Sequence, residues 1–97
     1  MLRHVVLLDW TPDVTEEQKY NLTEALDRLP TLIPTIRDYR FGPDAGINKG
    51  TFDFALVADF DDADGYRAYS DHPVHRDIVE RFIDPIAAQR ASVQYEF

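Results

Sequence analysis

Residues 69–75 read Tyr-Ser-Asp-His-Pro-Val-His, and this polar stretch opens the last long helical pattern of the chain. Pro73 suits the first position of a helix, because a residue at that position needs no backbone N–H. From there the residues at helical spacing along one stripe are His75, Ile78, Val79, Phe82, Ile83 and Ile86. An imidazole thus occupies the first slot of a core-facing stripe, with the Tyr69 phenol just before it. The stretch predicts a helix that begins at Pro73 and stops or kinks near Pro85.

Residues 52–60, upstream of this stretch, alternate in the way that is typical of a strand. One face carries Phe52, Phe54, Leu56, Ala58 and Phe60, and the other carries Asp53, Ala55, Val57 and Asp59. The pair Asp61 and Asp62 follows directly and is suited to begin a short helix that contains Tyr66 and Tyr69.

The first half of the chain predicts a strand, a helix and a second strand. Residues 3–10 form the strand, in which His4, Val6, Leu8 and Trp10 share one face. Thr15 and Gln18 have the spacing of a capping box, and we expect the helix to end at Pro30. Residues 36–41 form the second strand, and the glycine-rich segment 42–50 forms a loop. Residues 91–97 form a last strand.

The resulting order, β-α-β-β-α-β, is that of a ferredoxin-like α+β fold with a four-stranded antiparallel sheet. We expect residues 1–97 to form a single domain. The sheet face away from the helices would carry Val5, Leu7, Ala55 and Val57, which is too apolar to remain in water. A second copy stacked on this face would bury it, so the pattern predicts a homodimer.

Composition excludes several classes of function. The formal net charge of -8 argues against nucleic acid and anionic membranes as partners. There is no cysteine, so disulfides, thiolate metal sites and cysteine nucleophiles are excluded. The apolar run 5–8 is too short for the core of a signal peptide or for a membrane span, and we expect a cytoplasmic protein.

Several segments together resemble the stress-responsive dimeric α/β-barrel (Dabb) family. They are the start His4–Leu8, the helix opening at Thr15, Ile33-Pro34, Phe52–Phe60 and the Tyr69-x-x-His72-Pro73-x-His75 motif. The resemblance covers nearly the whole chain, and it implies a dimeric α/β barrel in which the two sheets face each other. Members include a cofactor-free plant polyketide cyclase that uses a tyrosine and a histidine for an aldol-type ring closure. By position in the motif, the resemblance assigns these two roles to Tyr69 and His75. A histidine of the cyclase's first strand corresponds to His4.

The resemblance implies that His75 is a general base and that Tyr69 donates a hydrogen bond to a carbonyl oxygen. The residues expected to bind the substrate around this pair are His4, Val6, Leu8, Leu22, Leu26, Leu56, Ile78 and Phe82. We expect neither a cofactor nor a metal, because His72 and His75 at a helix start lack a matched set of carboxylates. His72 is interpreted as structural. Leu22 and Thr23 replace bulky aromatic residues of the cyclase, so the pocket shape and the substrate do not carry over.

Three classes of function remain open at this point. The first is a cofactor-independent enzyme, a cyclase or isomerase, that acts on a small carbonyl compound such as a polyketide. The second is a binding protein for a small hydrophobic ligand, and the third is a stress-protective structural dimer with a filled core. Cofactor-free monooxygenase chemistry is a minor alternative that related barrels suggest. A cavity lined by His75 and Tyr69 would separate the first two classes from the third.

Overall fold

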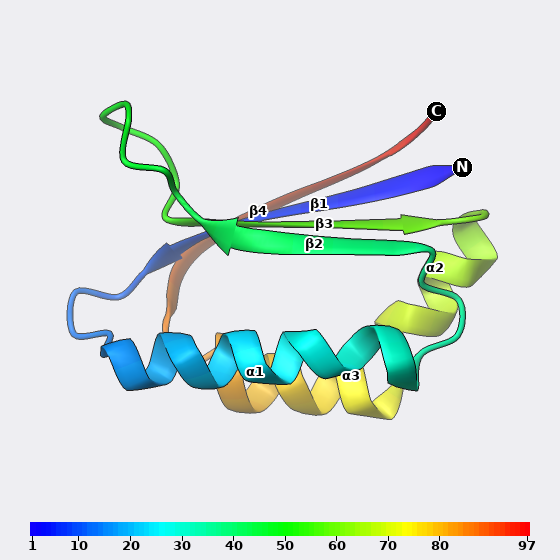
Figure 1. Ribbon diagram of the computed structural model, residues 1–97, viewed down its shortest axis with the longest axis horizontal. Helices are drawn as coiled ribbons and strands as arrows, with labels where there is room; N and C mark the ends of the chain where they lie inside the picture. The colour runs from blue at the N-terminus through cyan, green and yellow to red at the C-terminus, as the bar shows by residue number, and fades with distance from the viewer.

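Four strands form one antiparallel sheet, and the helices cover one of its faces (Figure 1). The computed structural model describes all 97 residues. Its elements are β1 (Leu2–Trp10), α1 (Glu16–Leu32), β2 (Asp38–Pro43), β3 (Phe54–Phe60), α2 (Ala63–Ser70), α3 (Pro73–Ile78), the π-helical turn η1 (Val79–Ile83) and β4 (Ala87–Glu96). The strands lie in the order β2-β3-β1-β4, which is the predicted ferredoxin-like α+β arrangement.

The pairing of β1 with β3 separates the two faces of the sheet as predicted. On the outer face, Val5 pairs with Val57 and Leu7 pairs with Ala55. On the inner face, Leu8 lies opposite Phe54, a pair of side chains that are both buried beneath the helices. Because successive side chains of a strand alternate between faces, this register fixes which residues reach the core.

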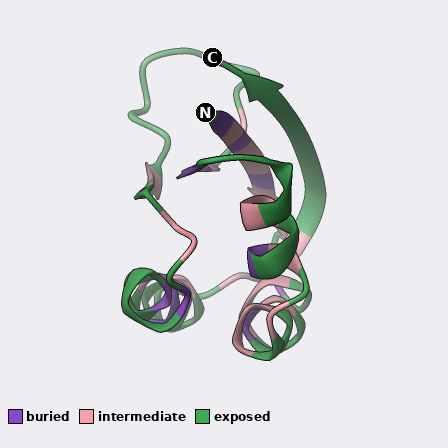
Figure 2. Cartoon of the chain, turned by 90° about the vertical axis from the view of Figure 1, so that its right-hand side faces the viewer, coloured by how far each residue is buried: buried purple, intermediate pink, exposed green.

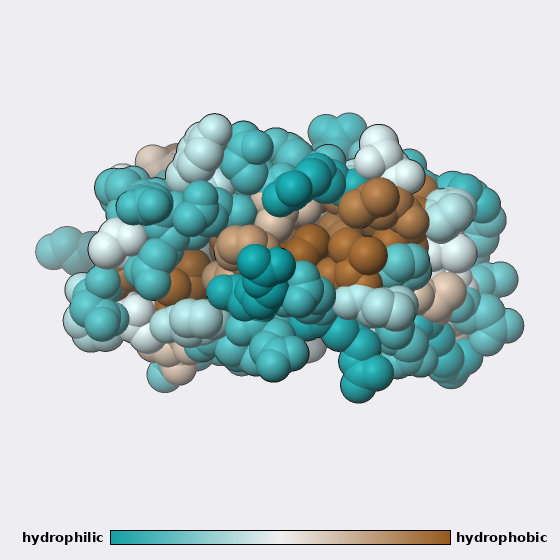
Figure 3. Space-filling model, turned by 90° about the horizontal axis from the view of Figure 1, so that it is seen from below, coloured by the Kyte–Doolittle hydropathy of each residue, from teal (hydrophilic) through white to brown (hydrophobic).

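The core lies between α1 and the inner face of β3 (Figure 2). The helix contributes Leu22, Ala25, Leu26 and Leu29, and the strand contributes Phe54, Leu56, Ala58 and Phe60. Seen from below, the helix layer is mostly hydrophilic, and apolar side chains show between the polar ones, with the largest apolar patch toward the right (Figure 3). No helix has the length and apolar character needed to cross a membrane.

The last strand, β4, has its apolar side chains on the outer face. Val93 pairs with Val5, and Val93, Tyr95 and Phe97 are 55%, 44% and 58% exposed. Its inner face instead carries Arg90, Ser92 and Gln94, since Arg90 lies opposite the inward-facing Leu8. A strand packed on a helical core normally turns its apolar side chains toward the helices, whereas β4 turns its polar side chains toward them.

The first helix begins where the sequence predicts and ends later. Thr15 accepts a hydrogen bond from the Gln18 backbone N–H at 3.1 Å, and the reciprocal half of the capping box is also present. The prediction that Pro30 ends the helix is wrong, because α1 continues to Leu32. Pro30 lies in the last turn, where it removes only the hydrogen bond to Leu26, and the turn buries Leu29 and Ile33 almost completely.

The predicted helix from Pro73 begins correctly but does not continue as one regular α-helix. His72 caps it by accepting a hydrogen bond from the Val74 N–H at 3.1 Å, which is the structural role expected for this residue. After Ile78 the backbone widens into η1, where the Asp84 N–H donates to the Val79 carbonyl at 2.8 Å. The helix then ends at Ile83, two residues before Pro85, which agrees with the predicted end near that proline.

The ends of three strands also differ from prediction. β2 starts at Asp38 instead of Ile36 and continues to Pro43, because it pairs with β3 until Pro43 lies opposite Phe54. A proline is tolerated there because β2 is an edge strand. β3 starts at Phe54 instead of Phe52. β4 starts at Ala87 instead of Ala91, because it pairs with β1 along its whole length.

Two leucines of α1 provide a matched test of this packing. Leu29 is 0% exposed and Leu32 is 47% exposed. We expect Leu29→Ala to lower the free energy of unfolding by about 2–5 kcal/mol, and Leu32→Ala to change it by less than about 0.5 kcal/mol. Urea denaturation of both variants measures the difference. Equal losses would contradict the placement of α1 on the sheet.

Candidate functional site

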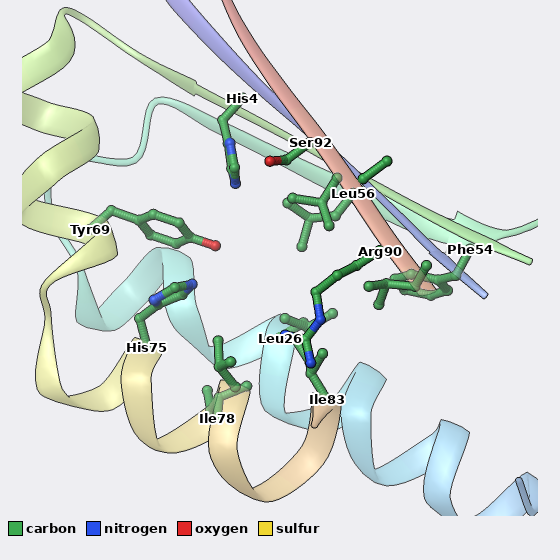
Figure 4. A pocket seen from close by; sticks show the side chains of 14 residues that line it. His4, Leu26, Phe54, Leu56, Tyr69, His75, Ile78, Ile83, Arg90 and Ser92 are labelled. Carbon is green, nitrogen blue, oxygen red and sulfur yellow. The ribbon is translucent and has the colours of Figure 1, made fainter. Parts of the chain in front are cut away.

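A cavity of about 210 Å³ lies between the inner face of the sheet and the segment formed by α3 and η1 (Figure 4). It is lined by His4, Val6, Leu8, Leu26, Phe54, Leu56, Tyr69, His75, Ile78, Val79, Ile83, Arg90, Ala91 and Ser92. The structure therefore brings both residues of the predicted catalytic pair to one cavity. Six of the eight residues predicted around that pair also line it: His4, Val6, Leu8, Leu26, Leu56 and Ile78.

Two residues that the sequence predicted for the pocket lie elsewhere. Leu22 is 0% exposed and belongs to the packed core between α1 and the sheet. Phe82 lies near Gln18 and Asn21 of α1. The π-helical turn explains the second error, because a wider turn rotates less per residue and Phe82 falls short of the cavity. Ile83, the next residue of the stripe, lines the cavity wall in its place.

Six lining residues were missed by the sequence analysis: Phe54, Val79, Ile83, Arg90, Ala91 and Ser92. The strand alternation of 52–60 carries a sufficient signal for Phe54, which shares a face with Leu56. Arg90 had no such signal, because the predicted last strand began one residue after it. Ser92 lies within that predicted strand, but its polar character did not suggest a wall facing the helices.

The short connection between α2 and α3 brings Tyr69 and His75 together. α2 begins at its N-cap Asp62, which accepts a hydrogen bond from the Gly65 N–H at 2.8 Å, and it ends at Ser70. The chain then turns so that the first turn of α3 returns beneath Tyr69. The two ring centroids are 4.2 Å apart with their planes inclined at 45°.

The hydrogen bonds of His75 define which of its nitrogens can act as a base. Nδ1 lies 3.2 Å from the Ser70 carbonyl oxygen, which can only accept, so Nδ1 carries the proton and Nε2 keeps a lone pair. Burial lowers the pKa of His75, and the charge of His72 acts in the same direction, whereas the bond to Ser70 opposes them. The ring is therefore neutral near pH 7, as a general base must be.

Tyr69 is 2% exposed, and its hydroxyl oxygen lies 2.9 Å from that of Tyr39 on β2. Burial raises the pKa of Tyr69 to about 12, although the hydrogen bond with Tyr39 acts in the opposite direction. Burial likewise raises the pKa of Tyr39. Both phenols are protonated near pH 7, so when Tyr39 donates to Tyr69, the Tyr69 O–H is free for a group in the cavity. Tyr39 had no role in the sequence analysis.

His4 extends from β1 toward the other side of Tyr69 (Figure 4). Gln94 Nε2 donates to His4 Nδ1 at 2.7 Å, which leaves the ring proton on Nε2. Burial lowers the pKa of His4 to about 4, and His75 adds to the effect. The ring centroid is 4.8 Å from that of Tyr66 and 6.2 Å from that of Tyr69.

No group of three or more His, Cys, Asp or Glu side chains is placed to hold a metal ion. His72, one of the two histidines considered for a metal pair, uses its Nδ1 in capping α3. The chemistry that the cavity residues themselves supply is acid–base chemistry by two neutral imidazoles and a phenol.

Comparison with known proteins gives a family and several solved structures. The family model of the Stress responsive A/B Barrel Domain, Dabb, matches residues 2–97. A dimeric ferredoxin-like protein of unknown function from Thermobifida fusca is 44% identical, with a TM-score of 0.91 over 99% of this chain and 90% of that chain. A dimeric protein of unknown function with a ferredoxin-like fold from Bacteroides fragilis is 33% identical, with a TM-score of 0.82 over 99% and 95% of the two chains.

The hydroxynitrile lyase from Passiflora edulis is 16% identical, with a TM-score of 0.85 over 97% of this chain and 90% of that chain. At this identity the likeness shows the fold alone. No curated protein matches this chain.

The buried histidines predict how stability depends on pH. Between the ordinary value of 6.5 and about 4, the unfolded chain binds a proton at His4 that the folded chain does not bind. The free energy of unfolding is therefore highest, as far as His4 is concerned, above pH 6.5, and it decreases as the pH falls toward 4. The lowered pKa of His75 acts in the same direction.

We expect His4→Asn to reduce the slope of unfolding free energy against pH in this window, measured by urea denaturation at several pH values. NMR titration of the wild-type imidazoles should give a midpoint near 4 for His4. An unchanged slope in His4→Asn would contradict the burial of a neutral ring.

Proposed function

Because the chain belongs to the stress-responsive A/B barrel domain (Dabb) family, we propose that it is a homodimer in which each protomer catalyses proton transfer on a small carbonyl compound. The reaction class is that of a cofactor-independent cyclase or isomerase. One observation carries the proposal. The neutral imidazole of His75 and the buried phenol of Tyr69, with ring centroids 4.2 Å apart, lie together on the wall of a largely apolar cavity.

In this reaction His75 is the general base and Tyr69 is the hydrogen-bond donor. His75 Nε2 removes a proton from the carbon next to a carbonyl group, while the Tyr69 O–H donates to the carbonyl oxygen as negative charge develops on it. The resulting enolate attacks a second carbonyl of the same molecule in a cyclase, or is reprotonated in an isomerase. The two phenol hydroxyls lie 2.9 Å apart, and in this reaction Tyr39 is the donor of the pair, so that the Tyr69 O–H remains available to the substrate.

The size and lining of the cavity support a small and partly apolar substrate. The cavity measures about 210 Å³, below the roughly 300–1,000 Å³ that is typical of sites for drug-sized ligands. Ten of its fourteen lining residues are hydrophobic, so a substrate that fills the cavity displaces water from the reacting groups. Exclusion of water strengthens the interaction between the Tyr69 hydroxyl and a developing enolate oxygen.

The outer sheet face supports the homodimer. Two relatives described as dimeric, at 44% and 33% identity, share the fold. In a single chain, Val93, Tyr95 and Phe97 remain about half exposed on this face beside Val5 and Val57. The charged pair on the same face is already satisfied, since Arg3 holds Asp59 through two hydrogen bonds of 2.7 and 2.9 Å. Burial of the apolar remainder contributes about 25 cal/mol per Å².

A ligand carrier is the second candidate function, because an apolar cavity binds small hydrophobic molecules without any reaction. Removal of the base separates the two candidates. Loss of a positioned base costs about 10²–10⁴ in rate, whereas loss of one hydrogen bond from a carrier costs about 1 kcal/mol in affinity.

For catalysis, we expect His75→Ala to lower turnover by about 10²–10⁴ and Tyr69→Phe to lower it by roughly 10²–10³. Poly-β-keto and aromatic-precursor compounds are screened by thermal shift, and bound compounds are then followed for loss of the linear form. Leu32→Ala, on the exposed side of α1, is the matched control. Turnover that survives His75→Ala undiminished would overturn the catalytic role. Binding without turnover in the wild type would favour the carrier.

For assembly, we expect the native protein to sediment as a dimer at micromolar concentration and Val57→Lys to sediment as a monomer or unfold. Val93→Lys should disturb the fold of the protomer less, because the Val93 side chain is already 55% exposed in the single chain. Leu32→Lys adds the same charge to the helix layer and should leave the dimer intact. A monomeric native protein would rule out the barrel.

A further inference from the structure

Arg90 introduces a positive charge at one end of the cavity. It is the only residue among the fourteen lining the cavity that is charged near pH 7, because the pKa values of both lining histidines are lowered. Its side chain reaches from β4 toward Leu26 and Ile83, whereas His4, Tyr69 and His75 gather at the other end (Figure 4). The cavity thus has a proton-transfer end and a cationic end, separated by apolar side chains.

The guanidinium of Arg90 is only partly engaged within the chain. Nη2 donates to Asp84 Oδ1 at 2.7 Å, and this is its one hydrogen bond. Arg3 and Arg37 each hold their aspartate through two nitrogens instead. The Arg90 and Asp84 side chains are 47% and 50% exposed, and ion pairs of this kind contribute little to stability. The remaining N–H groups of Arg90 are free to bind a second carboxylate.

The strand that carries Arg90 also presents polar groups along the cavity. Arg90, Ser92 and Gln94 lie opposite Leu8, Val6 and His4 on the inner face of the sheet. All three side chains are exposed in the single chain, and two of them, Arg90 and Ser92, also line the cavity. Gln94 is occupied by its hydrogen bond to His4, so Ser92 and Arg90 are the two donors of β4 at the cavity wall, and they suit an oxygen function followed by an acid.

We propose that Arg90 forms an anion subsite and that the substrate is a short carboxylic acid with a carbonyl group at its far end. The carboxylate binds the free edge of the Arg90 guanidinium, and the carbonyl reaches Tyr69 and His75. A carboxylate is favoured over a phosphate, because a single planar guanidinium matches a two-oxygen group and no second cation lines the cavity. This inference rests on the proposed function, since it names the substrate class of the same site.

The test compares acids with their uncharged esters. Binding of 5-oxohexanoate, 7-oxooctanoate and 4-acetylbenzoate, and of the methyl ester of each, is measured by isothermal titration calorimetry at low ionic strength. At least one acid should bind the wild type roughly tenfold more tightly than its ester, as expected for a charge-assisted hydrogen bond that is partly exposed to water.

Three variants test whether the preference for the acid over its ester depends on Arg90. Arg90→Gln should abolish the preference, because acid and ester then meet the same uncharged side chain. Arg81→Gln removes the same charge from η1 outside the cavity and should retain the preference. Asp84→Asn removes the competing carboxylate, so it should increase the preference. The last two variants keep the test valid if Arg90→Gln folds poorly, which circular dichroism detects.

The outcomes separate this inference from the proposed function. A preference for acids that survives Arg90→Gln, or its absence in the wild type, overturns the anion subsite and leaves the proton-transfer site standing. The preference in His75→Ala should equal that of the wild type, because this variant leaves Arg90 in place. Acids that bind through Arg90 without turnover support the subsite and favour the carrier over the catalyst. Failure of every acid and ester to bind overturns both.

Discussion

A buried phenol must have a hydrogen-bond partner, and much of this structure depends on how that requirement is met for Tyr69. Tyr39 supplies the partner at 2.9 Å from an edge strand, and the rings of Phe60 and His75 pack around the Tyr69 ring. These contacts tie α2, α3 and two strands to one side chain. The same hydroxyl faces the cavity, so the interaction that holds the helices to the sheet also orients the group proposed to donate to substrate.

Local chemistry was sufficient to predict the fold, since each decisive signal depended only on near neighbours. The Thr15 capping box, Pro73 at a helix start and the strand alternation over Phe54–Phe60 were confirmed. The helix end at Pro30 was wrong because burial of Leu29 and Ile33 opposes the local effect of proline. Such burial is a tertiary property, and no window of sequence around Pro30 contains it.

The site was predicted less completely, for a reason that concerns geometry. Tyr69 and His75 are close in sequence, so a motif was enough to bring them together. Phe82 was misplaced because the stripe assumed an α-helical turn where the chain forms a π-helical one. Arg90 was missed because the extent of β4 is set by pairing with β1, which is distant in sequence. Errors thus occurred where a residue's direction depends on a partner element.

The π-helical turn has a consequence for how this site can change over evolutionary time. A π turn differs from an α turn by one residue, and this one places Ile83 instead of Phe82 in the cavity wall. A single-codon deletion within Val79–Ile83 would restore α-helical phase and turn the side chains that follow it in the helix by one position at once. In related proteins, the insertion or deletion of one residue here would change the volume available to a ligand in a single step. A point substitution cannot change which residue faces the cavity in this way.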